Sequence, residues 1–415
     1  MSRRLPSIGV AVGLWLSCIA AAQAQPIGLE LHNTMMPAAG GMGGASIARP
    51  QEVLSSINGN PATMTQFDGN QFQFAGGFAY ANYDMNQTQA ALLPGVGVFN
   101  EQSAAPGSAV VNIGMNRRVS ILGADANVGF GLISNAGAAV DFRGVPASNG
   151  TSCSMLILEM MAPVGVRLTD RLSIGANVGV GTAFFDGPFV GNGAMVSAYG
   201  LRCAAGTTYD LTDFTTASFY WQSKQNFNFE DAISLQLFNN TFSQTFDVRM
   251  DLPTTYGLGL ANQRLLDGNL LLAIDLLYKE WSNADLYEAV YRNQWALQFG
   301  TQYSINRLRL RAGYVYAQNP MKPIGSVTIG GITPPGGIPA LSYTQALLSS
   351  LNQNRISFGV GMVDVMPGLD FDLFAGGMLS EAASTGPSTT VRMDSWYVGG
   401  GATFRFGRNG VRSTN

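Results

Sequence analysis

The chain has little of the charge and histidine that soluble enzymes use. Charged residues make up 12% of its 415 residues, and His32 is the only histidine. A well-behaved soluble surface is about 25–35% charged, so this composition disfavours a protein surrounded by water. A catalytic site with a histidine base would depend on one residue. We therefore expect no enzyme and no catalytic residue.

Cysteine is also scarce, with three residues at 18, 153 and 203. No Cys/His spacing typical of a metal site occurs, so we expect no metal and no cofactor. Nothing in the sequence indicates whether Cys153 and Cys203 form a disulfide.

Long apolar runs are missing except near the N-terminus. Arg3 and Arg4 precede an apolar stretch over residues 8–20, and Ala22-Gln23-Ala24 supplies the small residues that a signal peptidase reads. This pattern predicts a secretory signal peptide over residues 1–24. The stretch is short for a transmembrane helix, which needs about 20 apolar residues.

Positive charge is in deficit as well. Without the two arginines of the signal peptide, 21 basic residues remain against 26 acidic ones. Nucleic-acid-binding domains are basic, so we expect no nucleic acid as a partner.

What the chain does have, from about residue 70 onward, is a hydrophobic period of two. Phe72, Phe74, Phe78 and Tyr80 fall on one face of the first such segment. Alternation of this kind predicts strands with one apolar side. We expect about fourteen of them, over residues 70–82, 108–118, 121–142, 153–168, 171–186, 195–209, 213–229, 241–262, 268–282, 289–304, 307–318, 353–365, 369–381 and 390–406.

The connections between these strands alternate in length. Short turns such as that at Asp267-Gly268 alternate with longer loops such as 83–107 and 319–352. Short periplasmic turns and long external loops are typical of outer-membrane barrels. A soluble β-sandwich is the alternative, but the strands reach ten residues or more and carry few charges on their polar faces. We therefore expect an all-β fold, a transmembrane antiparallel β-barrel over residues 69–406 in the bacterial outer membrane.

Residues 25–68 lack this period and are rich in Gly, Ala and Met. Such a segment is either a periplasmic tail or a plug that folds into the barrel. A barrel this wide needs a plug to stop it leaking. Residues 407–415 form a short basic tail after the last strand.

Several motifs, in order along the chain, resemble the FadL-type transporters of long-chain fatty acids, which include uptake proteins for aromatic hydrocarbons. Asn60-Pro61-Ala62, after the Gly- and Ala-rich stretch 38–45, resembles the end of that family's N-terminal hatch. Residues 133–142 resemble its kinked third strand, and the segments near 252–259, 273–282, 293–303 and 311–314 resemble the second half of its barrel. The tail after Phe406 departs from the family, whose members usually end at an aromatic residue.

The resemblance implies a fourteen-stranded barrel plugged by an N-terminal hatch over residues 25–68. It implies passive uptake in which the hatch rearranges and the ligand leaves sideways at the kinked third strand, at Ser134, Asn135, Ala136 and Gly137. A bulge or weak strand is the plain alternative for those four residues, because small residues and Gly lower strand preference. Likewise Asn60-Pro61-Ala62 is either a simple turn or the anchor of the hatch.

Charged residues on the inward faces of the strands are the remaining candidates. One of them could capture a carboxylate headgroup, and the alternative is a ladder of mutually paired charges that braces the wall and the hatch. The full inward set is Arg249, Asp251, Asp275, Lys279, Arg292, Arg309, Arg311, Arg355, Asp370 and Asp372. The cations singled out for a headgroup are Arg249, Lys279, Arg292 and Arg311.

The sequence thus predicts an outer-membrane channel for hydrophobic small molecules, with long-chain fatty acids first and aromatic or aliphatic hydrocarbons second. A general porin, with an open water-filled lumen, is the other channel-forming alternative, and a structural barrel or adhesin is a further one. The expected partners are the hydrophobic ligand, outer-membrane lipid and lipopolysaccharide, and the barrel-assembly machinery. The resemblance implies a monomer.

Overall fold

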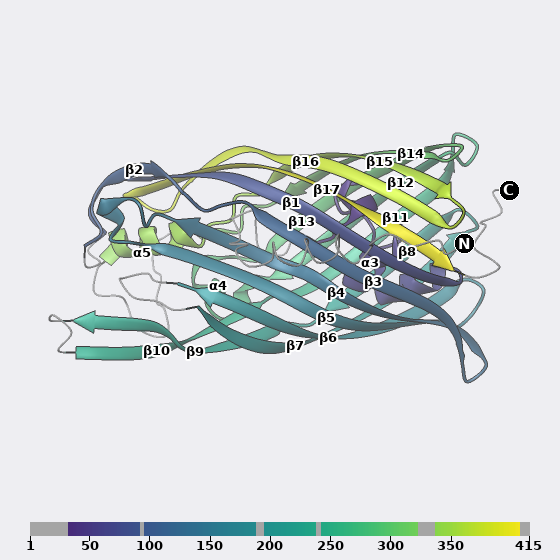
Figure 1. Ribbon diagram of the computed structural model, residues 1–415, viewed down its shortest axis with the longest axis horizontal. Helices are drawn as coiled ribbons and strands as arrows, with labels where there is room; N and C mark the ends of the chain where they lie inside the picture. The colour runs from purple at the N-terminus through teal and green to yellow at the C-terminus, as the bar shows by residue number, and fades with distance from the viewer. Residues whose placement is uncertain (1–31, 92–94, 188–194, 238–241, 323–336, 407–415) are drawn as a thin grey trace, which may run out of the picture.

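The computed structural model describes residues 32–91, 95–187, 195–237, 242–322 and 337–406 (Figure 1). The expected signal peptide (1–24), the first residues of the expected hatch (25–31) and the C-terminal tail (407–415) lie outside the described residues. Within the described residues, no helix combines the length and the apolar character needed to cross a bilayer.

Fourteen long antiparallel strands close into a barrel, because the last strand, β17, pairs with the first, β1, from Asn70↔Phe406 to Gln87↔Thr389. The expectation of a fourteen-stranded antiparallel barrel is confirmed. The strands of the barrel are β1 (Asn70–Gln87), β3 (Ser108–Ile121), β4 (Ala124–Asp141), β5 (Ser152–Arg167), β6 (Leu172–Asp186), β7 (Val196–Thr212), β8 (Thr215–Gln222), β11 (Thr254–Leu265), β12 (Leu270–Glu280), β13 (Gln294–Ile305), β14 (Leu308–Ala317), β15 (Asn354–Met366), β16 (Leu369–Ser384) and β17 (Thr389–Phe406).

The outer face of the barrel carries an exposed apolar belt with aromatic residues at both edges. Phe72 and Phe404 lie together near one end, with ring centroids 6.3 Å apart, and Tyr80 stacks on Trp396 at 6.0 Å further along the same two strands. Eight residues separate Phe72 from Tyr80, which is about 26 Å along a strand. With the strand tilt of about 40° usual in such barrels, this length covers about 20 Å of the height of a transmembrane apolar band, which is about 25 Å.

Two expected strands are each interrupted. The expected strand 213–229 divides into β8 and β9 (Gln225–Leu237), and the expected strand 241–262 divides into β10 (Phe242–Leu252) and β11. Pro253 explains the second break, because proline has no N–H to donate to a ladder. As a result β9 and β10 pair only with each other, and the hairpin stands beyond the closed sheet at the left of Figure 1.

The external loops contain more structure than the sequence indicated. The expected loop 83–107 contains the end of β1 and a short strand, β2 (Phe99–Gln102), that pairs with it. The expected strand 289–304 begins only at Gln294, because a short helix, α4 (Tyr287–Val290), precedes it. The remaining elements are the helix α5 (Gly337–Leu347) and the 3-10 turns η3 (Pro146–Ser148) and η4 (Trp281–Asn283).

The segment before the first strand folds inside the barrel. It contains α2 (Pro37–Gly40), α3 (Val53–Asn58) and the 3-10 helix η2 (Pro61–Gln66), and nearly all of its described residues are buried. Figure 1 shows α3 enclosed by the strands, toward the end of the barrel where β1 begins and β17 ends. We refer to residues 32–67 as the hatch. Because α4, α5 and the β9–β10 hairpin lie at the opposite end, that end is the external mouth.

Candidate functional site: a plugged lumen beside a gap in the wall

Asn60 ties two parts of the hatch to the barrel wall. Its side-chain Oδ1 accepts a hydrogen bond from the backbone N of Ala62 at 3.1 Å and so caps η2, whose first residue is Pro61. Its Nδ2 donates to the carbonyl of Ile47 in the hatch (3.0 Å) and to that of Thr207 on β7 (3.2 Å). Asn60 is fully buried. Its side chain therefore both caps η2 and connects the hatch to β7.

The wall is shaped to receive the hatch at glycines. A Cβ added to Gly206 on β7 would clash with Oδ1 of Asn60, and one added to Gly313 on β14 would clash with the backbone of Gly43. Gly43 itself has φ +69°, a conformation that glycine adopts without strain. Backbone therefore packs on backbone around the hatch.

Two buried carboxylates hold the hatch through its backbone N–H groups. Oδ2 of Asp275 on β12 accepts from the N of Ser46 (2.6 Å) and of Ile47 (2.8 Å). Glu52, within the hatch, accepts from the N of Ala38 (2.7 Å) and of Ala39 (2.8 Å) at the start of α2. Such polar contacts satisfy buried backbone donors of the hatch.

Glu52 is also connected to the wall. Gln73 on β1 donates from Nε2 to Glu52 at 3.1 Å, and its Oε1 accepts from the N of Leu54 at 3.0 Å. The hatch is thus joined to β1, β7 and β12 by side-chain hydrogen bonds.

The third strand of the barrel, β4, is irregular where the sequence indicated a kink. Its ladder with β3 ends at Ile113↔Leu132, and its ladder with β5 shifts register between Ser134 and Ala136, so that Asn135 forms a bulge. Where the ladder with β3 ends, a side chain takes the place of a backbone acceptor. The backbone N of Ser134 donates to Oδ1 of Asn112 at 2.9 Å.

Beyond this point β4 has no ladder partner on its β3 side among the described residues. Pairing on that edge resumes at Asp141, whose carbonyl accepts from the N of Ala104 at 2.7 Å and whose N donates to Oγ of Ser103 at 2.9 Å. We call the stretch from Ala136 to Val140 the gap. Gly137 is one of its five residues. Backbone groups without hydrogen-bond partners are tolerated at membrane depth only where they line a cavity, so a cavity is expected beside the gap.

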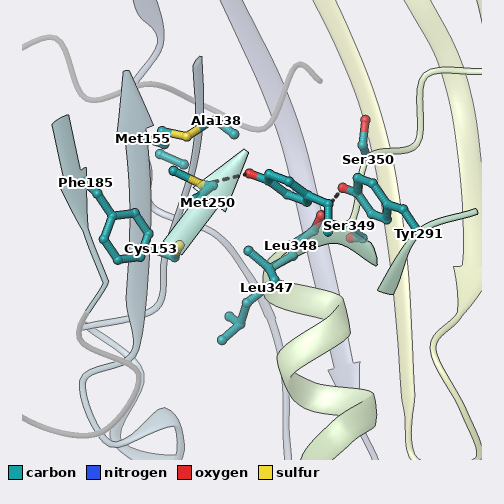
Figure 2. A pocket seen from close by; sticks show the side chains of 12 residues that line it. Ala138, Cys153, Met155, Phe185, Met250, Tyr291, Leu347, Leu348, Ser349 and Ser350 are labelled. Carbon is teal, nitrogen blue, oxygen red and sulfur yellow. Dashed lines mark hydrogen bonds between the residues drawn. The ribbon is translucent and has the colours of Figure 1, made fainter. Parts of the chain in front are cut away.

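A narrow apolar cavity of ≈ 30 Å³ lies beside the gap (Figure 2). Ala138 and Ala139 of the gap form one side of it. Its other lining residues come from β5, β6, β10, α4 and the residue after it, and the end of α5 and the residues after it: Cys153, Met155, Phe185, Met250, Tyr287, Tyr291, Leu347, Leu348, Ser349 and Ser350. A volume of ≈ 30 Å³ holds about one water molecule, so an apolar ligand needs the lining to move.

Tyrosines hold α5 and the residues that follow it, which together we call the lid, in place over this cavity. The hydroxyl of Tyr291 donates to the carbonyl of Leu348, and that of Tyr83 donates to the carbonyl of Ala346. Burial raises the pKa of the Tyr343 hydroxyl in α5 to about 12 and the pKa of Tyr287 well above its ordinary value. Tyr343 and Tyr287 therefore stay neutral at physiological pH.

The four cations singled out from the sequence are placed differently from one another. Arg249 is exposed on β10, in the hairpin outside the closed sheet, and Arg292 is exposed at the external mouth, where Nε donates to the carbonyl of Asn319 at 3.1 Å. Arg311 is buried and donates to Asp372 at 2.6 Å. Lys279 is buried on β12 with 6% of its surface exposed.

Sequence reasoning named Asp275 only as one of a set of inward charges that could brace the wall and the hatch, and it assigned no role to Glu52 or to the tyrosines of the lid. Alternation along a strand predicts which side of the sheet the side chain of Asp275 faces, but it does not predict which residue of the hatch that side chain contacts. Among the described residues, no group of His, Cys, Asp and Glu side chains is arranged to hold a metal ion. Cys153 and Cys203 are both free thiols, the first buried and the second exposed.

The closed strands, the apolar belt and the internal hatch define a plugged outer-membrane β-barrel. Solved structures share this arrangement over most of the chain. A FadL homologue of Pseudomonas aeruginosa superposes with a TM-score of 0.69 at 15% identity, over 93% of this chain and 100% of its own. The toluene transporter TodX of P. putida gives 0.67 at 16% identity (92% and 100%), and TbuX of Ralstonia pickettii, also a toluene transporter, gives 0.61 at 14% (94% and 100%).

No family model matches the sequence, and no curated protein matches it. The structural likeness therefore carries the assignment: the chain has the FadL-type fold.

Proposed function

We propose that this protein takes up hydrophobic small molecules across the outer membrane, with long-chain fatty acids as the leading substrate class. The single observation that carries the proposal is the juxtaposition of the gap in β4 with an apolar cavity that Ala138 and Ala139 also line. An apolar molecule in that cavity can leave into the bilayer without crossing the hatch or entering water. The FadL homologue and the toluene transporters, which share the fold, support the same class of function.

In this proposal Ser134, Asn135, Ala136 and Gly137 form the lateral exit, and Asn60, Pro61 and Ala62 form the hatch anchor. A ligand first enters under the lid formed by α5 and the residues that follow it. It displaces the lid from Ala138 and Ala139 and then moves sideways through the gap. The hatch rearranges at its polar contacts and blocks the passage of water and ions throughout.

Aromatic or aliphatic hydrocarbons are the second candidate substrates, because the lining of the cavity is apolar and the toluene transporters share the fold. A general porin is disfavoured, since the hatch fills the described lumen and a porin keeps its lumen open. Outer-membrane lipid, lipopolysaccharide and the barrel-assembly machinery remain proposed partners, and the protein is proposed to act as a monomer.

Uptake of radiolabelled oleate by cells that lack their own fatty-acid transporter tests this proposal. We expect the chain to restore uptake, and Ala138→Phe, which fills the cavity beside the gap, to abolish the gain. Ala109→Phe is the matched control, because Ala109 is exposed on the lipid-facing side of β3, opposite Phe78. A correctly assembled barrel that takes up neither oleate nor toluene would contradict the proposed function.

A further inference from the structure

A second cavity lies on the outside of the barrel, at its external end, between β1, β2, β16 and β17. Its volume is ≈ 440 Å³, and all but one of its lining residues are polar. Two of them are carboxylates, Asp84 and Glu101, and one is a cation, Arg392. The other polar residues carry amide or hydroxyl groups: Asn86, Asn100, Gln102 and Thr390. We call this cavity the outer pocket.

Strand alternation places the outer pocket on the same face of the sheet as the apolar belt. Asp84 lies on the same face of β1 as Tyr80, and Tyr83 between them is buried in the interior of the barrel. Arg392 lies on the same face of β17 as Trp396, which stacks on Tyr80. The outer pocket therefore faces the membrane side of the wall, and a substrate in the lumen does not reach it.

The outer pocket lies above the external edge of the belt. Asp84 is four residues beyond Tyr80 on β1, which is about 13 Å along the strand and about 10 Å in height at a tilt of about 40°. Headgroups raise the thickness of a phospholipid bilayer from about 30 Å to about 40–45 Å, so they add only about 5–7 Å on each side. A lipid that fills the pocket therefore needs a taller headgroup than a phospholipid has.

The register of the strands brings opposite charges side by side in the outer pocket without joining them. Arg392 is the ladder partner of Asp84 on β1 and of Ala382 on β16, and Gln102 on β2 pairs with Asp84 in the same row. Within the part of the chain that the structure describes, Arg392 and Asp84 make no ion pair and no side-chain hydrogen bond. Both groups are therefore available to a ligand.

Other charged groups at the external end of the barrel are paired. Glu381 on β16 accepts hydrogen bonds from the backbone N of Asn354 at 3.0 Å and from its Nδ2 at 2.9 Å. Arg143, after β4, forms an ion pair with Asp141 at 2.6 Å. The unpaired donors and acceptors of the outer pocket are thus a local feature and not a general property of this end.

We propose that the outer pocket binds the phosphorylated sugar headgroup of lipopolysaccharide, whose acyl chains lie along the belt below it at Phe78, Tyr80 and Trp396. Arg392 binds a phosphate group, because a guanidinium matches phosphate oxygens in a bidentate geometry. Asp84 and the amide side chains accept hydrogen bonds from sugar hydroxyls, which are donors that a purely anionic headgroup lacks. Sugar rings also supply the height that a phospholipid headgroup lacks.

The outer pocket spans the seam at which the barrel closes. Asp84 belongs to the first strand of the barrel and Arg392 to the last, and the two strands pair along their whole length. A headgroup bound to both strands stabilises the closed barrel, because it binds the folded protein and not the unfolded chain. We therefore expect lipopolysaccharide to raise the unfolding temperature of the wild type.

The test is equilibrium binding of radiolabelled rough lipopolysaccharide, which keeps a short sugar core, to the purified full-length protein in detergent micelles. Arg392→Gln is expected to weaken binding about tenfold or more, since it removes a charge-assisted hydrogen bond. Ala382→Trp, which fills the pocket without changing its charge, is expected to abolish binding. Arg143→Gln removes the same charge at the same end of the barrel, and this matched control is expected to keep the affinity of the wild type.

Two further measurements separate binding from a structural role of these residues. Without lipopolysaccharide, Arg392→Gln is expected to unfold at the temperature of the wild type, because Arg392 bonds to no other described side chain. With lipopolysaccharide, the wild type gains more than the variant does. Oleate uptake by cells is expected to be unchanged in Arg392→Gln and in Ala382→Trp, because the outer pocket lies outside the lumen.

Equal binding of lipopolysaccharide to the wild type, Arg392→Gln and Ala382→Trp would overturn the proposal. Phosphatidylglycerol or inorganic phosphate that competes as well as unlabelled lipopolysaccharide would overturn it too, because the sugar headgroup would then not be what is recognised. Binding to the wild type that EDTA abolishes would show instead that a divalent cation bridges the carboxylates and the phosphates, and it would overturn the direct role of Arg392.

Discussion

Oδ2 of Asp275, on the barrel wall, lies 2.8 Å from the backbone N of Ile47 in the hatch. The carboxylate reaches across the lumen and satisfies a donor that the hatch cannot satisfy by itself. The hatch is therefore fixed to the wall by a polar contact in addition to its apolar packing.

Replacing Asp275 by Leu should loosen the hatch. The N–H groups of Ser46 and Ile47 lose their acceptor, which costs about 1–3 kcal/mol for each buried group left unsatisfied. We expect a lower unfolding temperature and a higher ion conductance in planar bilayers. Asp267→Asn, in an exposed turn, is the control and should leave both unchanged. A conductance equal to that of the wild type would show that Asp275 does not hold the hatch.

Substitutions at Asn60 should separate its two roles. Asn60→Asp keeps the oxygen that caps η2 through Ala62 but loses the N–H groups that reach Ile47 and Thr207, whereas Asn60→Ala loses both. We expect oleate uptake to fall in both variants at equal surface expression. Stability should fall in both as well: by about 1 kcal/mol in Asn60→Ala for the lost cap, and in Asn60→Asp because a buried carboxyl group then faces the carbonyls of Ile47 and Thr207. Uptake that is normal in Asn60→Asp would limit the motif to a structural turn.

Deleting Asn135 should regularise the wall. Without the bulge, Ser134 and Ala136 face successive residues of β5, so β4 becomes straighter and the gap narrows. We expect the barrel to assemble and oleate uptake to drop several-fold. Deuterium exchange of the backbone N–H groups from Ala136 to Val140 measures the closure directly. Undiminished uptake with a protected edge would place the exit elsewhere.

Removing the hydroxyls that hold the lid should release it. Tyr291→Phe and Tyr83→Phe each lose a hydrogen bond to a carbonyl near the end of α5. We expect faster proteolysis of the segment 342–350 in whole cells, about additive in the double variant. Tyr256→Phe, on the barrel strand β11, is the control. Equal cleavage in all variants would show that apolar packing alone holds the lid.

Much of the barrel could be predicted because alternation is a local property. Each strand shows its apolar face within ten residues, so Phe72 or Leu272 can be assigned to the lipid side without knowing any neighbour. The interruption at Pro253 could in principle have been predicted, since a proline has no N–H to donate within a ladder. The hydrophobic alternation continues on both sides of Pro253, however, and it favoured a single strand over residues 241–262.

The candidate site could be predicted only in part. Asn60 and the irregularity at Asn135 followed from short motifs. Asp275 and Tyr291 did not, because what matters about them is the residue across the lumen. Arg249 illustrates the same limit. The alternation around it correctly indicates a strand, but that strand, β10, lies outside the closed sheet, so Arg249 does not face the lumen of the barrel.

By itself, the sequence determined that this chain forms a barrel of amphipathic strands with a non-alternating segment before them, and the resemblance to FadL-type transporters guided the count of about fourteen. These are consequences of period, length and turn residues, which act over a few neighbours. Only the tertiary structure decided that the segment fills the lumen, that the wall has a gap beside an apolar cavity, and that Asp275 contacts the hatch. Those features depend on contacts between residues hundreds of positions apart, such as Ile47 and Asp275, and closure of the barrel is what brings them together.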